Sequence, residues 1–137
     1  MKLIMQHPHP KACVLACIAM VEGVNLETVI ALAGDPGQPN YDTRLKIAKH
    51  FGRQYGYMSE CGVPIQFWGE GNLMDMMRAH ETLLVSVNSI TDPNFSHAAV
   101  IHQRQLYDPH YGMNPTWEWD KVLSRAYCVQ PKVAHGG

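Results

Sequence analysis

Three residues whose types can together perform nucleophilic catalysis occur far apart in this sequence: Cys13, His97 and Asp108. A cysteine thiolate attacks a carbonyl carbon, an imidazole carries the proton, and a carboxylate orients the imidazole. Cys13 opens the apolar run of residues 13–20, His97 opens the strand-like run of residues 97–101, and Asp108 closes a further short segment. Each candidate therefore lies at the end of an expected helix or strand. Functional residues are common in loops and at the ends of such elements.

The element that positions Cys13 is predicted to be a buried helix over residues 11–21, because this run is apolar almost all round. Pro10 suits the first turn of this helix, and Gly23 ends it. Cys13 then lies where unpaired backbone N–H groups and the positive end of the helix dipole favour a thiolate. Cys17, one turn further on, is expected to stay protonated and inert in its apolar surroundings.

The elements that position His97 and Asp108 are predicted to be the two arms of a hairpin, residues 97–103 and 105–108. A turn centred between residues 102 and 103 pairs position 97 with position 108. Directly opposed residues share a face, with Cβ atoms about 4.5–5.5 Å apart. The carboxylate would then hold one imidazole nitrogen and leave the other to face the thiol. A longer loop with the same centre is equally compatible with the sequence.

The remaining elements follow from periodicity, caps and turn residues. Helices are expected over residues 26–32, 43–51, 73–80 and 117–124, and strands over residues 82–90 and 125–130, with one short strand and a long loop within residues 53–71. Asn25 and Asp42 are the expected N-caps of the first two of these helices, and Leu45, Ala48 and Phe51 form the inner stripe of the second. Helices followed by mostly antiparallel strands predict an α+β fold, with N-terminal helices packed on a C-terminal antiparallel sheet.

Length and composition restrict the classes of protein. The 137 residues suit a single domain spanning residues 1–137, and 46% of them are hydrophobic. The net charge of −1 without a basic stripe indicates no nucleic-acid partner. No apolar run approaches the roughly 20 residues that span a bilayer, and no signal-peptide pattern is present, so a cytoplasmic protein without a membrane partner is expected. The four cysteines are accordingly interpreted as free thiols.

Histidines close to Cys13 raise the alternative of a metal site. His7, His9 and Cys13 are closely spaced, and His102 and His110 flank the predicted hairpin. Neither spacing matches a strong zinc pattern. The interpretation is therefore a site without a metal or another cofactor.

Three short blocks of the chain resemble the C39-type cysteine peptidases, a branch of the papain-like superfamily. Gln6, Cys13 and the run Ala16-Cys17-Ile18-Ala19-Met20 are similar to the amino-terminal motif of that family. The run Ser96-His97-Ala98-Ala99-Val100-Ile101 resembles its histidine strand, and Tyr107-Asp108-Pro109-His110-Tyr111-Gly112 resembles its Asp-Pro-x-x-Gly turn. The similarity extends from Gln6 to Gly112.

This resemblance implies a papain-like cysteine peptidase fold and assigns a role to each candidate. Cys13 is the nucleophile, His97 the general base and acid, and Asp108 the orienting carboxylate. Gln6 donates its side-chain amide to the oxyanion hole, beside the backbone N–H of Cys13. The chain departs from the family pattern in three ways: Gln6 is seven residues before Cys13, one more than usual, Val14 replaces a common glycine, and the hairpin is shorter.

The resemblance and the residues together predict a stand-alone thiol hydrolase that cleaves a peptide or isopeptide bond through an acyl-enzyme on Cys13. Its partner would be a peptide or protein substrate, and the sequence gives no indication of the oligomeric state. Val14 and the short hairpin also fit a degenerate member that binds a peptide or a host protein without cleaving it. The same triad also fits an acyl or γ-glutamyl transferase. The small size suits a bacterial or phage-encoded protein.

Overall fold

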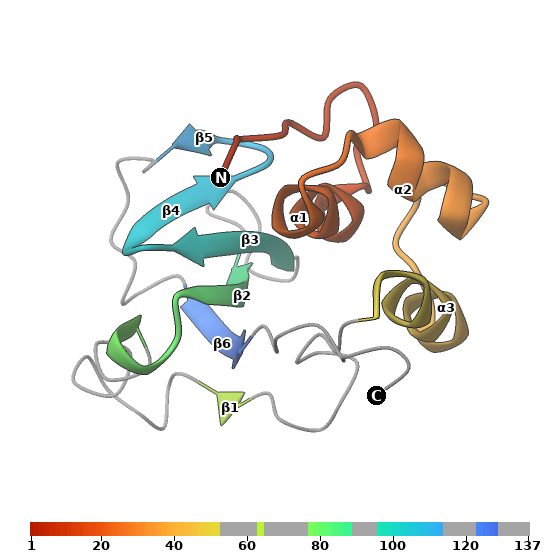
Figure 1. The fold of residues 1–137 in the computed structure, drawn as a ribbon. Helices are drawn as coiled ribbons and strands as arrows, with labels where there is room; N and C mark the ends of the chain where they lie inside the picture. The colour runs from red at the N-terminus through yellow and green to blue at the C-terminus, as the bar shows by residue number, and fades with distance from the viewer. Residues whose placement is uncertain (53–62, 65–76, 89–95, 114–122, 129–137) are drawn as a thin grey trace.

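A computed structural model of the chain describes residues 1–52, 63–64, 77–88, 96–113 and 123–128 (Figure 1). Helices come first in this part of the chain, and strands follow. Their bounds are α1 Cys13–Glu22, α2 Leu26–Ala33, α3 Tyr41–Phe51, β1 Val63–Pro64, β2 Thr82–Asn88, β3 Ser96–His102, β4 Gln105–Asp108, β5 Gly112–Met113 and β6 Leu123–Cys128. The strands form one antiparallel sheet in the order β1-β6-β2-β3-β4-β5. The predicted α+β class, with N-terminal helices and an antiparallel sheet, is confirmed.

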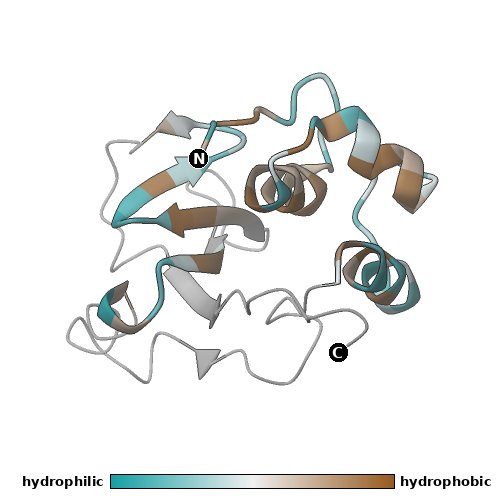
Figure 2. Ribbon diagram, viewed as in Figure 1, coloured by the Kyte–Doolittle hydropathy of each residue, from teal (hydrophilic) through white to brown (hydrophobic). Residues whose placement is uncertain are grey.

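Helix α1 is the buried helix that the sequence predicts. Every residue from Val14 to Met20 is buried, and Figure 2 shows this helix as hydrophobic around most of its surface. Gly23 ends the helix with a φ of 69°, a left-handed conformation that glycine adopts without strain. The helix begins at Cys13 rather than at Lys11, so Pro10 lies in the turn before it and not in its first turn.

The core lies between α1, the sheet and the other two helices. Helix α1 contacts β3 on one side and α2 on another, and α2 in turn contacts α3 (Figure 1). Leu84 and Val100 join this core from the sheet, Val29 from α2 and Ile47 from α3. Each fully buried aliphatic side chain contributes about 1.5–3 kcal/mol to folding. The position of α1, and with it the position of Cys13, is therefore fixed by the core.

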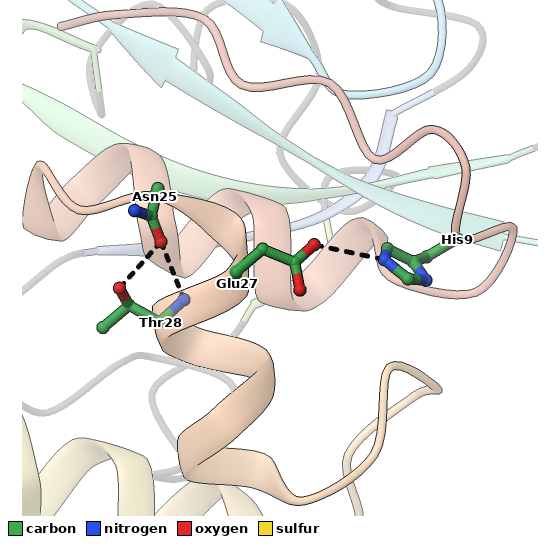
Figure 3. A network of polar contacts seen from close by, with 4 residues as sticks. All are labelled: His9, Asn25, Glu27 and Thr28. Carbon is green, nitrogen blue, oxygen red and sulfur yellow. Dashed lines mark hydrogen bonds and ion pairs between the residues drawn. The ribbon is translucent and has the colours of Figure 1, made fainter.

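The N-cap of α2 is the predicted residue, whereas the N-cap of α3 is a different residue from the predicted one. Asn25 caps α2, and its Oδ1 accepts hydrogen bonds from the N–H (2.8 Å) and the hydroxyl (2.7 Å) of Thr28 (Figure 3). Helix α3 is capped by Asn40, which accepts from the N–H of Thr43 at 2.9 Å. The prediction that Asp42 is this cap is wrong. Asp42 lies instead in the first turn, where its charge favours the helix dipole.

The predicted inner stripe of α3 is also partly wrong. Ile47 and Ala48 are the buried residues of this helix, whereas Leu45 is 41% exposed. Residues 47, 48 and 51 lie on one face because neighbours three and four positions apart stack along a helix. Leu45 is two positions from Ile47, about 200° around the helix axis, so burying Ile47 turns Leu45 outward.

The β3–β4 hairpin has a different register from the predicted one. Val100 pairs with Tyr107 and His102 pairs with Gln105, so the turn consists of the two residues 103 and 104. The prediction of a turn centred between residues 102 and 103 is therefore wrong by one residue, and the pairing is shifted by two. Since side chains alternate with a period of two, a two-residue shift keeps every residue on its predicted face.

The new register changes how His97 and Asp108 are related. Continuing it by one step places Asp108 across from Ala99, and position 97 lies two residues further along the same face of β3. Such diagonal neighbours are about 7–8 Å apart, whereas directly opposed residues are closer. The register of the paired residues therefore does not place His97 directly across from Asp108, as was predicted.

The turn itself stores strain. Gln103 and Arg104 have φ values of 49° and 64°. This left-handed pair matches the twist of a hairpin but is unfavourable for residues with a Cβ atom. Replacing Arg104 by glycine is expected to raise the free energy of unfolding by about 0.5–1 kcal/mol, measured by chemical denaturation. The matched control Gln105→Gly, in the extended strand, is expected to lower it. Destabilisation by both substitutions would show that residue 104 carries no backbone strain.

Several predicted elements fall partly or wholly outside the described residues. Residues 73–76, 89–90, 117–122 and 129–130 are in this group, while residues 77–79 are helical as predicted. β1 fulfils the prediction of a short strand within residues 53–71. Residues 123 and 124 belong to β6, so the predicted helix over 117–124 is wrong at its end, and the last strand starts two residues earlier than predicted.

None of the described helices is by itself long and apolar enough to cross a bilayer. Helices α1 and α2 reach the necessary length and apolar composition only when taken together, and they are bent by 118° at the break between them.

Candidate active site

Cys13 is the first residue of α1, and backbone N–H groups surround its thiol. No side chain caps the start of this helix, and its first turn contains no acidic residue. The first N–H groups of a helix have no partner within the helix. Here the backbone N–H groups of Cys13 and Val14, and the N–H of Ala98 from β3, act on the Cys13 thiol and lower its pKa. The thiol therefore lies at the end of the helix where these backbone donors are available.

The electrostatic balance at Cys13 opposes the thiolate among the described groups. Burial raises the pKa of the Cys13 thiol above its ordinary value, and this is the largest influence. The three backbone N–H groups lower the pKa, while the negative charge of Asp108 raises it again. The backbone N–H groups at the helix N-terminus lower the pKa, the direction that was predicted, but desolvation outweighs them. A positive charge beside Cys13 would favour its ionised form.

Cys17 behaves as predicted for an inert thiol. It is completely buried on the inner side of α1, and both cysteines of this helix are free thiols. Burial raises the pKa of Cys17 well above its ordinary value, and the charges of Cys13 and Asp108 act in the same direction. Cys17 is therefore a core residue, whereas Cys13 is partly exposed.

His97 reaches the site through its backbone. It lies in β3 and pairs with Val87 of β2. The N–H of the peptide unit that joins His97 to Ala98 acts on the Cys13 thiol and lowers its pKa. Strand β4 pairs with β3 only from Val100 onward, so this peptide lies beyond their paired region. The description of His97 ends at its backbone, and the contacts of its imidazole lie outside the described part of the structure.

Asp108 is completely buried at the end of β4. Its Oδ1 accepts hydrogen bonds from the backbone N–H groups of His110 (2.8 Å) and Tyr111 (3.0 Å), which close the turn between β4 and β5. A buried carboxylate needs such donors because desolvation of an unpaired charge is costly. The negative charge lies close enough to Cys13 to act on its thiol. Asp108 is thus held rigidly within electrostatic range of the candidate nucleophile.

Gln6 is brought to the same end of the sheet. Its backbone N–H donates to the carbonyl oxygen of Pro109 at 2.9 Å, directly after Asp108. Its side chain is buried, and Nε2 donates to the carbonyl oxygen of Pro10 at 2.9 Å. Within the described part of the chain, Oε1 is buried without a hydrogen-bond partner. Turning the amide over would bring Oε1 against the Pro10 oxygen, so the hydrogen bond fixes the orientation of the amide.

That orientation bears on the predicted role of Gln6. An oxyanion donor must direct an N–H at the reacting carbonyl oxygen. Nε2 has two hydrogens, and one of them is used by Pro10. The carbonyl oxygen of His9 lies 3.4 Å from Nε2, a long contact for the second. The role of Gln6 in an oxyanion hole stays a prediction, and the described contacts give Gln6 a structural role as well.

The histidines near the site do not assemble a metal centre. Among the described residues, no group of three or more histidine, cysteine, aspartate or glutamate side chains could hold a metal ion. His9 instead turns to α2, where its Nε2 lies 3.3 Å from Oε1 of Glu27 (Figure 3). His102 contacts the hydroxyl of Thr82 through Nδ1 at 2.8 Å.

Two backbone contacts of the site have no direct signal in the sequence. The bond from Gln6 to Pro109 joins segments from opposite ends of the described chain. The contact of the Ala98 N–H with Cys13 depends on how α1 packs on β3. The Asp-Pro sequence at 108–109 indicates a turn, which could have suggested the backbone bonds of Asp108.

The sequence was compared with known protein families and with curated proteins. No protein-family profile matches this sequence, and no curated protein is similar to it.

Proposed function

We propose that this protein is a papain-like cysteine peptidase in which Cys13 is the nucleophile. The observation that supports this most strongly is the packing of α1, which begins at Cys13, against β3, which contains His97. This packing brings the candidate nucleophile, at the start of a buried helix, to the strand of the candidate base, and the N–H of Ala98 next to His97 lowers the pKa of the Cys13 thiol. Asp108 is buried within electrostatic range of the same thiol, and Gln6 is bonded to the residue that follows Asp108.

The proposed reaction has two halves. His97 takes the proton of Cys13, and the thiolate attacks the carbonyl carbon of the substrate. The N–H of Cys13, together with the Gln6 amide, stabilises the oxyanion. The tetrahedral intermediate collapses to a thioester, and His97 protonates the leaving amine. Water, deprotonated by His97, then attacks the thioester and releases the carboxylic acid with a regenerated thiol. Asp108 orients the imidazole and stabilises its charged form.

One observation favours a second candidate, a protein that binds a peptide without cleaving it. Burial raises the pKa of Cys13, and a thiol that stays protonated is a poor nucleophile. The two candidates therefore differ in one property, the fraction of thiolate at neutral pH. An imidazolium at His97 would supply the cation that the other described groups lack.

The pH dependence of Cys13 alkylation by iodoacetamide tests the proposal. An ion pair with His97 is expected to keep the reaction going well below pH 8.5, the ordinary pKa of a free thiol. In His97→Ala, no imidazolium opposes the burial of the thiol and the negative charge of Asp108, so the pKa of Cys13 is higher than in the wild type and less thiolate is present at any given pH. We expect the wild-type rate at pH 6 to exceed that of His97→Ala by about 10–100-fold, after allowing for the lower nucleophilicity of a low-pKa thiolate.

Peptide mapping by mass spectrometry assigns the alkylated residue in this experiment. The matched control is His102→Ala, which removes another imidazole from the far end of β3 and is expected to leave the profile unchanged. Identical profiles in wild type and His97→Ala, both with a pKa above 8.5, would exclude the proposed mechanism and favour the binding protein.

Gln6→Ala separates the two roles of this residue. Loss of the bond from Nε2 to Pro10 is expected to lower the free energy of unfolding by about 1 kcal/mol. Loss of an oxyanion donor is expected to lower kcat by about 100-fold, with little change in KM. Thermal unfolding and steady-state kinetics measure the two effects, with Gln38→Ala, in an exposed loop, as the control. A stability loss without a kcat effect would restrict Gln6 to its structural role.

A further inference from the structure

A pocket of about 250 Å³ lies beside the candidate active site, where the segment before α1 meets the turn after β4. Both of its walls are anchored to site residues. Gln6 lines the pocket, and its side chain holds Pro10, three residues before Cys13. Pro109 lines the opposite wall, follows Asp108, and accepts the backbone hydrogen bond of Gln6. The pocket therefore adjoins the two segments that lead to Cys13 and to Asp108.

The lining of the pocket has an unusual composition. Three imidazoles and three prolines contribute to it: His7, His9 and His110, with Pro8, Pro10 and Pro109. Aspartate and glutamate are absent from this lining. Glu27 lies outside it, and its Oε1 contacts the Nε2 of His9 (Figure 3). The buried Asp108, which also lies outside the lining, accepts from the backbone N–H of His110. His7 and His110 are exposed, and the ring of His110 is fixed by an edge-on contact with Tyr111 at 4.5 Å between ring centres.

Imidazoles favour a particular class of ligand. A neutral imidazole donates one N–H, and a protonated one donates two and carries a positive charge. Carboxylates accept such bonds, and charge-assisted hydrogen bonds of this kind are stronger than neutral ones. Proline walls add rigid apolar contact without competing donors, since proline has no backbone N–H. The pocket therefore suits a short side chain that ends in a carboxylate.

We propose that this pocket is a specificity subsite that binds a carboxylate of the substrate, within two residues of the bond that is cleaved. This inference rests on the proposed peptidase function, because it places the pocket beside the reacting bond. The carboxylate belongs either to an internal aspartate or glutamate or to the C-terminus of the peptide. His7 and His110 donate to it, while His9 remains with Glu27.

Cleavage of a peptide library prepared from a digested proteome, analysed by mass spectrometry of the new termini, tests the subsite. Wild type is expected to show about tenfold enrichment of a carboxylate at one position near the cut, the factor expected for one charge-assisted hydrogen bond. Enrichment of internal aspartate or glutamate near the cut would show that the pocket binds an acidic side chain. Cleavage close to the C-terminus of the peptides would show that it binds the terminal carboxylate. The double variant His7→Gln/His110→Gln is expected to lose the enrichment while still cleaving. His50→Gln, an exposed histidine of α3, is the control and is expected to keep it.

The failures of the two proposals are distinguishable. Cleavage without carboxylate enrichment overturns the subsite and leaves the peptidase function standing, as does enrichment that persists in the double variant. Absence of cleavage overturns the peptidase function, and the pocket is then judged by NMR on Cys13→Ala. Acetyl-glutamate N-methylamide is expected to shift the imidazole resonances of His7 and His110, and acetyl-glutamine N-methylamide is not. Equal shifts with both compounds, or none with either, would overturn carboxylate binding in the pocket.

Discussion

Cys13→Ala is expected to abolish hydrolysis, with a fall in kcat on the order of 10⁴–10⁶-fold, because no other group can form the thioester. The substitution is expected to leave the fold intact. Cys13 is only partly buried at the first position of α1, and alanine has a high helix propensity. Steady-state kinetics and thermal unfolding of the same preparation measure the two effects. Retained hydrolysis in Cys13→Ala would rule out the mechanism.

The neighbouring cysteine provides a matched control with the opposite expected outcome. Cys17 is completely buried one turn further along α1 and has a pKa far above its ordinary value. Cys17→Ala is expected to retain activity but to lose about 1 kcal/mol of stability, since it removes a buried apolar group. Cys13→Ala is thus expected to affect catalysis and Cys17→Ala to affect stability, although both replace a cysteine of the same helix by alanine.

Asp108→Asn is expected to lower kcat by about 10²–10⁴-fold, because a neutral amide neither stabilises an imidazolium nor fixes its tautomer in the same way. The turn is expected to survive this substitution. The Oδ1 of asparagine can still accept from the N–H groups of His110 and Tyr111, although bonds to a neutral acceptor are weaker by about 1 kcal/mol each. Asp42→Asn, in an exposed first-turn position of α3, is the control for the loss of one negative charge.

The direction in which Asp108→Asn changes the pKa of Cys13 shows whether Asp108 acts directly on the thiol or through the imidazole of His97. The negative charge of Asp108 raises the pKa of the Cys13 thiol, so removing the charge alone would lower that pKa and speed alkylation at a given pH. If Asp108 acts mainly by holding a positive imidazole at His97, its loss would raise the pKa and slow alkylation. We expect Asp108→Asn to raise the pKa of Cys13 when His97 is present. In the His97→Ala background we expect the same substitution to lower it. A lowered pKa in both backgrounds would assign Asp108 a structural role in the turn only.

Local chemistry explains which parts of the fold were predictable. The N-cap Asn25, the terminal Gly23 and the continuous apolar run of α1 act within a few residues, and the structure has them where the sequence predicts. The prediction of Asp42 as the cap of α3 is wrong because Asn40, two residues earlier, is an equally competent cap. Asn40 follows Pro39, which is buried, so tertiary packing decides where the helix begins.

Competition between weak turns explains the error in the hairpin. Neither His102-Gln103 nor Gln103-Arg104 is a favourable two-residue turn, so the sequence does not distinguish their registers. In the structure, Gln103 bonds to Glu81 through both its backbone N–H (2.9 Å) and its side chain (2.9 Å). These bonds come from the segment before β2, which sequence neighbours cannot reveal. The residues of the candidate site could be predicted from the sequence. The register of the β3–β4 hairpin and the hydrogen bond from Gln6 to Pro109 could not, because they depend on contacts between distant segments.

The hydrogen bond between Gln6 and Pro109 has a consequence for how the protein loses activity on heating. The segment before α1 packs at the outer end of the sheet, and of its residues only Ala12 joins the core while Leu3 and Ile4 pack partly buried against it; the helices and the central strands carry the rest of the core (Figure 1). Regions held by few buried contacts open at a lower free energy than the core does. Detachment of this segment would disassemble the site and leave the rest folded. Inactivation would then be a reversible local opening that precedes global denaturation, and amide hydrogen exchange at Gln6 would report it directly.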